Sequence, residues 1–203
     1  MAYSHPVSRY YAGFHHIVAH TGNNTVLIRK RPTVASLVAF SDGTNEKLIA
    51  ENTINEQAGF DIDDDTGAFF VLVRRNDGLY EYRSAYFGNR WTKDGVKISG
   101  TEEYSHPVSK YYCGFHHVLV HDGNNTVLIR FKPGEPDLIA FSDGTTVKVV
   151  ATGTANERAA FEVDDLTGAF VAVVRRGDKL YEYRAPYPGC DWTENGIEIK
   201  TEG

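Results

Sequence analysis

Residues 72–82 read LVRRNDGLYEY, a pattern of two short β-strands joined by a tight turn. Asn76-Asp77-Gly78 favours the positive φ angles that two-residue hairpin turns require, and it is the strongest hairpin signal in the chain. In the second strand Tyr80 and Tyr82 would share one face, because side chains of a strand alternate. The stretch therefore predicts antiparallel β-structure.

This stretch occurs twice. Residues 173–183 read VVRRGDKLYEY, and the same register extends without a gap from Ser4–Glu102 to Ser105–Gly203, with more than half of the aligned positions identical. We expect two β repeats, residues 1–103 and 104–203, and a site built by one half should also be built by the other.

A weaker repeat lies inside each half. Gly13-Phe14 resembles Gly59-Phe60, and Val26–Lys30 resembles Val71–Arg75. Four units of about 50 residues would suit a small all-β propeller, and these units could form one continuous propeller. The alternative is two β-barrel or β-sandwich domains of about 100 residues each.

The first half contains short runs that are rich in β-forming residues and separated by Gly, Asn and Asp, and no segment keeps a helical apolar period. Strands are predicted at Phe14–His20, Thr25–Lys30, Ser36–Ser41, Lys47–Asn52, Phe69–Arg74, Leu79–Arg83 and Val96–Ser99.

The composition excludes several classes of protein. A hydrophobic share of 41% and a charged share of 24% are those of a globular domain, and a net charge of -6 argues against nucleic acid as a partner. No apolar run approaches the roughly 20 residues of a membrane span. No leader peptide is visible after Met1, so we expect a cytoplasmic protein or one exported without a leader.

Aromatic and charged residues cluster around the hairpin. Trp91 and its counterpart Trp192 are the two tryptophans of the chain. A sugar ring stacks on an aromatic side chain while fixed polar groups bind its hydroxyls, so the cluster is a candidate carbohydrate site; the alternative is that these aromatics pack in the core. The cluster consists of Arg74, Arg75, Tyr80, Glu81, Tyr82, Tyr86 and Trp91, repeated as Arg175, Arg176, Tyr181, Glu182, Tyr183, Tyr187 and Trp192.

The hairpin, followed by Trp91-Thr92-Lys93-Asp94-Gly95, resembles a blade of the fucose-binding β-propeller lectins of fungi and bacteria over about 25 residues in each half. In that family an Arg, a Glu from the next strand and an aromatic ring contact the sugar. The resemblance implies sites at Arg74, Glu81 and Trp91 and at Arg175, Glu182 and Trp192, with Tyr80 and Tyr181 beside them.

All eight histidines fall into two matched quartets. His16 and His20 would share one face of a strand, as would His117 and His121, so the four are candidate ligands for zinc, nickel or copper. A structural role in hydrogen bonds is the alternative. No cofactor is expected.

We predict a lectin with at least two equivalent sites that cross-links glycans or glycoproteins and that could form a homo-oligomer. The alternatives are a defence protein or inhibitor that binds a protein target through its loops, such as Pro32–Ser36 and Pro133–Asp137, and a metal-binding protein. No Gly-x-Ser-x-Gly motif, P-loop or Rossmann glycine run is present, so the sequence predicts a protein that is not an enzyme.

Overall fold

The computed structural model describes residues 2–164, 166–186 and 191–200, which form two compact units, Met1–Glu102 and Glu103–Gly203. The described residues contain strands and turns and no helix. In particular, no helical segment among them has the length and apolar character needed to cross a lipid bilayer.

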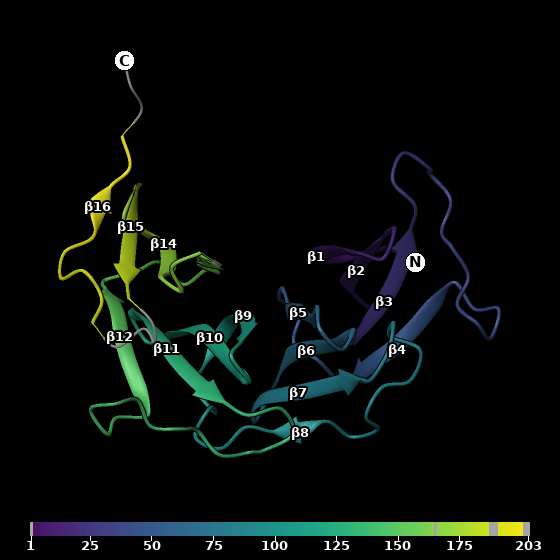
Figure 1. Ribbon diagram of the computed structural model, residues 1–203, viewed down its shortest axis with the longest axis horizontal. Coiled ribbons are helices and arrows are strands. Elements are labelled where there is room, and N and C mark those ends of the chain that lie inside the picture. Colours follow the sequence, from purple (N-terminus) through teal and green to yellow (C-terminus); the bar gives the residue numbers. More distant parts are fainter. Residues whose placement is uncertain (1, 165, 187–190, 201–203) are drawn as a thin grey trace. The chain divides into compact units, whose positions relative to one another are not determined.

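Each unit contains two four-stranded antiparallel sheets (Figure 1). The strands of each sheet follow one another along the chain, which is the meander of a propeller blade. In the first unit the strands are β1 (Ser4–Tyr11), β2 (Phe14–Thr21), β3 (Asn24–Lys30) and β4 (Glu46–Glu51), then β5 (Gly59–Asp63), β6 (Ala68–Arg75), β7 (Gly78–Ser84) and β8 (Val96–Lys97). In the second they are β9 (Ser105–Tyr112), β10 (Phe115–Asp122), β11 (Asn125–Phe131) and β12 (Val147–Thr152), then β13 (Ala160–Val163), β14 (Phe170–Arg176), β15 (Lys179–Ala185) and β16 (Ile197–Glu198).

These four blade-like sheets confirm the predicted fold class, an all-β protein of the propeller type. The weaker repeat inside each half is nevertheless out of step with the sheets. It equates Phe14, at the start of the second strand of one sheet, with Phe60, in the first strand of the next. By their order in the two sheets, β2 corresponds to β6 and β3 corresponds to β7.

Most predicted strands of the first half are present, with two differences. Ser36–Ser41 is not a strand, and only Leu37 forms an isolated bridge, to Lys30. Two strands were missed, Ser4–Tyr11 and Gly59–Asp63. The first of these contains Pro6, and the pairing register shifts there next to His5, whose φ is 49°. Pro and a bulge both weaken the sequence signal of a strand.

The core of the first unit lies between its two sheets. Val18, Leu27 and Ile49 of the first sheet pack with Val71 and Tyr82 of the second, and all five are buried. Arg9 on β1 also reaches across to Asp61 on β5, with 3.0 Å between Nε and Oδ1.

The second unit repeats this packing with Leu119, Leu128, Ala172 and Tyr183. Its cross-sheet ion pair joins Lys110 and Glu162 at 2.5 Å, so both partners of the first pair are exchanged and the charges are retained. An ion pair thus joins the two sheets at the same position in both units, although the residues differ.

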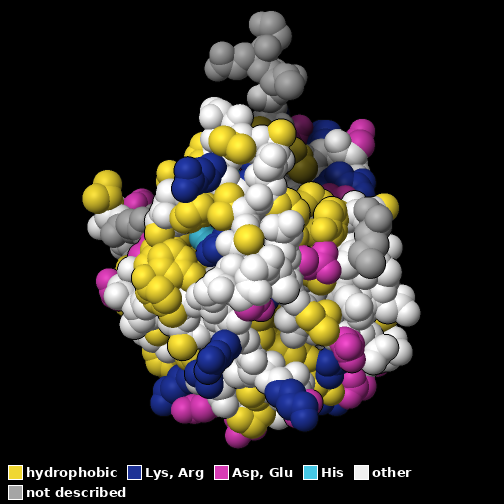
Figure 2. Space-filling model, turned by 90° about the vertical axis from the view of Figure 1, so that its right-hand side faces the viewer, with side chains coloured by type: hydrophobic (Ala, Val, Ile, Leu, Met, Phe, Trp, Pro, Cys, Tyr) yellow, Lys and Arg dark blue, Asp and Glu magenta, His cyan; other side chains and the backbone are white. Residues whose placement is uncertain are grey.

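Figure 2 shows one face of the molecule, on which Lys and Arg side chains are interspersed with Asp and Glu side chains along the lower part. This part of the face therefore lacks the area of uniform positive charge that a nucleic-acid-binding surface would present.

Candidate functional site

A cavity of about 480 Å³ opens in the first unit between the last strand of the first sheet, β4, and the segment that follows β7. It is lined by aromatic, cationic and acidic side chains, and its size suits a small ligand such as one or two sugar rings. The lining residues are Lys47, Leu48, Ile49, Ala50, Glu51, Asn52, Arg75, Asn89, Trp91, Thr92, Lys93 and Asp94.

Trp91 is held in place by its neighbour Thr92. The Thr92 amide donates to the carbonyl oxygen of Arg83 at 2.9 Å, and the Thr92 Oγ1 accepts from the Arg83 amide at 3.1 Å. The indole packs against the core and remains partly exposed. Its buried Nε1 has no hydrogen-bond partner among the described residues, although a buried indole N–H usually has one.

Arg75 forms the polar side of the cavity. Its guanidinium lies over the ring of Tyr80, 4.5 Å from the centroid, and donates to the hydroxyl of Tyr82. The Tyr82 hydroxyl in turn donates to the carbonyl oxygen of Asp94 at 3.2 Å, and burial raises the pKa of Tyr82. These contacts fix the cation in one orientation before any ligand arrives.

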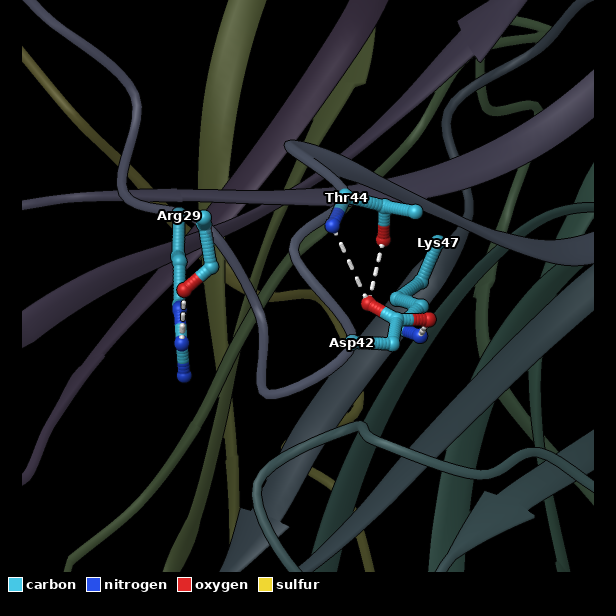
Figure 3. Close-up of polar contacts among 5 residues, drawn as sticks. Arg29, Asp42, Thr44 and Lys47 are labelled. Carbon is cyan, nitrogen blue, oxygen red and sulfur yellow. Dashed lines mark hydrogen bonds and ion pairs between the residues drawn. The ribbon is translucent and has the colours of Figure 1, made fainter.

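The other wall is fixed by the loop before β4 (Figure 3). The Asp42 carboxylate accepts from the amide of Thr44 at 3.1 Å, from its hydroxyl at 2.7 Å, and from the ammonium of Lys47. The Lys47 ammonium is the main cause that holds the pKa of Asp42 well below its usual range. Lys47 therefore lines the cavity with its ammonium group paired to Asp42.

Arg29 holds the same loop from the other end. It lies over the ring of Phe40 at 4.5 Å and donates to the carbonyl oxygens of Val38 and Ala39. One side chain thus binds the carbonyl groups of two successive residues, which would point to opposite sides in a regular strand. This explains why residues 36–41 are not a strand despite their apolar sequence.

The second unit contains the same site. Its cavity of about 420 Å³ is lined by Val149, Val150, Ala151, Thr152, Arg176, Tyr183, Asp191, Trp192, Thr193, Glu194 and Asn195. Thr193 makes the same two hydrogen bonds to the backbone of Arg184, at 2.9 and 3.1 Å. Arg176 donates to Tyr183 at 3.1 Å and lies 5.0 Å from the centroid of the Tyr181 ring. The Trp192 Nε1 is again buried without a partner among the described residues.

The structure divides the predicted site residues between two faces of the hairpin. Trp91 and Tyr80 lie on the face of β7 that carries Tyr82, whereas Arg74 and Glu81 lie on the opposite face, as strand alternation requires. Arg74 lies 3.5 Å from Glu56, and Glu81 is 1% exposed.

The second unit has the same division. Trp192 and Tyr181 pack on the Tyr183 face, while Arg175 binds both carboxylate oxygens of Glu157, at 2.9 and 3.0 Å. Glu182 accepts from Arg184 at 2.6 Å. That any of these residues contacts a ligand remains a prediction.

The cation beside each tryptophan is Arg75 or Arg176, the second arginine of each pair. Sequence reasoning placed both in the aromatic cluster but left them out of the site. The signal was available, since residues 75, 73 and 71 pair with 78, 80 and 82 across the hairpin and so share a face with the tyrosines.

The histidines lie apart from this cavity. His16 is buried with its ring 4.7 Å from that of Phe69, and burial is the main cause that lowers its pKa to about 4. His117 makes the same contact with Phe170, and its pKa is lowered to about 3.

His20 and His121 are bound to the backbone. Their Nε2 atoms donate to the carbonyl oxygens of Thr53 and Thr154 at 3.1 and 3.3 Å. Within the described ranges, no group of three or more His, Cys, Asp or Glu side chains is arranged to hold a metal ion.

Solved structures of other proteins share this fold, among them two glycoside hydrolases. A xylan β-1,4-xylosidase from Bacillus halodurans C-125 superposes with a TM-score of 0.59 and 11% sequence identity, over 94% of this chain and 41% of that one. A GH43 glycoside hydrolase engineered to display both endo-xylanase and exo-arabinofuranosidase activity superposes with a TM-score of 0.53 and 13% identity, over 98% and 44%. The chain thus spans less than half the length of either structure. No protein-family model matches the sequence, and no curated protein does.

These comparisons correct the prediction that the protein is not an enzyme, because two glycoside hydrolases share its fold. They also bear on the predicted resemblance to fucose-binding lectins: the propeller fold is shown, and a specific relation to those lectins is not.

Proposed function

We propose that this protein binds glycans in the cavities at Trp91 and Trp192, one in each unit. One observation carries the proposal: in both units a tryptophan lines the same cavity as an arginine that is stacked on one tyrosine and hydrogen-bonded to another. The indole supplies a face for the C–H groups of a sugar ring, and the arginine supplies oriented donors for its oxygens. The carbohydrate-active enzymes that share the fold support the same ligand class.

Two sites in one chain would allow the protein to cross-link glycans, and this is the lectin role that we propose. Linked weak sites bind a surface bearing many glycans more tightly than either site alone, provided that both can engage. The test is agglutination of beads that carry a mixture of acidic and neutral glycans, by the wild-type protein and by Trp91→Ala and Trp192→Ala. Each variant should still bind immobilised glycan but lose agglutination. Agglutination by either single variant would contradict bivalence through these two cavities.

Glycoside hydrolysis is a second candidate, favoured by the carboxylates in each cavity. Glu51 and Asp94 line the first cavity, and Asp191 and Glu194 line the second, while glycosidases use a pair of such groups. Release of reducing ends from the glycans that bind should be measured for the wild-type protein and for Glu51→Gln and Glu194→Gln. Turnover that each substitution lowers would favour hydrolysis, whereas turnover that neither substitution changes would place the activity elsewhere.

A further inference from the structure

The two cavities share their frame but differ in the charges beside the indole. The frame of tryptophan, threonine, arginine and two tyrosines is identical in both units. In the first unit the indole is flanked by Arg90 and Lys93, and in the second by Asp191 and Glu194, so both flanking charges are reversed. Arg90 is exposed, and Lys93, Asp191 and Glu194 line the cavities.

The remaining differences reduce this contrast in charge without removing it. Glu51 and Asp94 of the first cavity correspond to the neutral Thr152 and Asn195. Lys47 and its counterpart Lys148 are each bound to an aspartate of their own loop. The first cavity is therefore lined by two cations without an ion-pair partner among the described residues, Arg75 and Lys93, together with the carboxylates of Glu51 and Asp94, whereas the second is lined by one cation, Arg176, together with the carboxylates of Asp191 and Glu194.

We propose that the two cavities select glycans of different charge: the first binds glycans that carry a carboxylate or sulfate group, and the second binds neutral or amino-substituted glycans. This inference rests on the proposed glycan binding. A ligand anion next to Trp91 would form charge-assisted hydrogen bonds to Lys93, and the exposed Arg90 would add to the local positive charge. The same anion next to Trp192 would face Asp191 and Glu194, and such like-charge repulsion is an effective way to reject a ligand.

The second cavity also has the means to attract its own ligands. Carboxylates accept hydrogen bonds from sugar hydroxyls, and they attract the ammonium group of an amino sugar. A chain with this pair of cavities would connect an acidic glycan to a neutral or basic one, rather than two copies of the same glycan.

The test reads each cavity separately in the full chain. Trp192→Ala leaves only the first cavity, and Trp91→Ala leaves only the second. Both variants are applied to an array of neutral, amino, uronic-acid and sulfated glycans, after circular dichroism has shown that they are folded. Trp192→Ala should favour the acidic glycans over matched neutral ones by about tenfold, less at high salt, and Trp91→Ala should reject them. The uronic-acid and sulfated arms distinguish the two sources of negative charge.

Charge exchange supplies the decisive control, because it leaves both tryptophans in place. Arg90→Asp with Lys93→Glu should remove the acidic preference of the first cavity, and Asp191→Arg with Glu194→Lys should create one in the second. Identical glycan rankings for the two Trp→Ala variants would overturn the inference and leave glycan binding intact. No binding of any glycan by the wild-type protein would overturn both.

Discussion

The guanidinium carbon of Arg75 lies 4.5 Å from the centroid of the Tyr80 ring, and the same guanidinium donates to the hydroxyl of Tyr82. One cation is thus oriented by two tyrosines that come from alternate positions of β7. The arrangement recurs at Arg176, Tyr181 and Tyr183, so the cation of each site is held by strands of the blade rather than by a loop.

Arg75→Lys tests this arrangement, with Arg74→Lys as its matched control. Lysine keeps the charge but loses the planar group that stacks on Tyr80, so we expect glycan affinity to fall by about tenfold. Arg74 lies on the opposite face, and its substitution should change affinity by less than about twofold. Isothermal titration in the Trp192→Ala background measures both. A larger loss for Arg74→Lys would favour the site implied by the lectin resemblance.

Gly95→Ala should damage the wall of the first cavity. Gly95 has a φ of 67°, and a Cβ atom there would lie 2.7 Å from the Tyr82 ring. We expect a loss of about 2–4 kcal/mol in the free energy of unfolding, from backbone strain and displacement of the ring. Gly13→Ala is the control, because its φ is 86° and nothing lies within 4 Å of the added Cβ, so it should cost only about 1 kcal/mol. Equal losses in urea denaturation would show that Tyr82 tolerates the contact.

The fold was more predictable than the site, and particular residues show why. Alternation and the turn at Asn76-Asp77-Gly78 identify the hairpin directly, because both are local properties. The strand at Ser4–Tyr11 is obscured by Pro6, and residues 36–41 have the composition of a strand while Arg29 binds their carbonyl groups. Such a contact depends on the tertiary structure, and a sequence pattern does not contain it.

The choice between Arg74 and Arg75 is a different case. The resemblance favoured the first arginine, whereas alternation along β6 places the second beside the tyrosines. The alternation that distinguishes Arg75 from Arg74 is visible in the sequence itself, but the prediction follows the lectin resemblance instead. The charge reversal around the two tryptophans is also visible in the sequence. Its effect on ligand binding could not be predicted, because it depends on the cavities that the fold creates at these positions.

Stability should decrease in mild acid because of two buried histidines. The pKa values of His16 and His117 are lowered to about 4 and about 3, so the unfolded chain binds more protons than the folded one below about pH 6.5. Each histidine should make the free energy of unfolding fall by up to about 1.4 kcal/mol per pH unit between pH 6.5 and its folded pKa. His16→Phe with His117→Phe should flatten this slope. Phe14→Leu, which alters packing at the same ring, should lower the curve without flattening it.

The cross-sheet ion pair should be exchangeable between units. Replacing Arg9 and Asp61 by Lys and Glu reproduces the pair of the second unit and should leave stability within about 1 kcal/mol of wild type. Asp61→Asn alone should cost about 1–3 kcal/mol, because it leaves the partly buried Arg9 without its carboxylate. A double-mutant cycle in urea measures the coupling, and additive effects would mean that the pair does not hold the sheets together.

The most direct measurement is the stoichiometry of glycan binding by isothermal titration of the wild-type protein, Trp91→Ala, Trp192→Ala and the double variant. With a glycan that both cavities accept, or with one glycan for each, we expect two sites in the wild-type chain, one in each single variant and none in the folded double variant. Undiminished binding by the folded double variant would contradict the assignment of glycan binding to these two cavities.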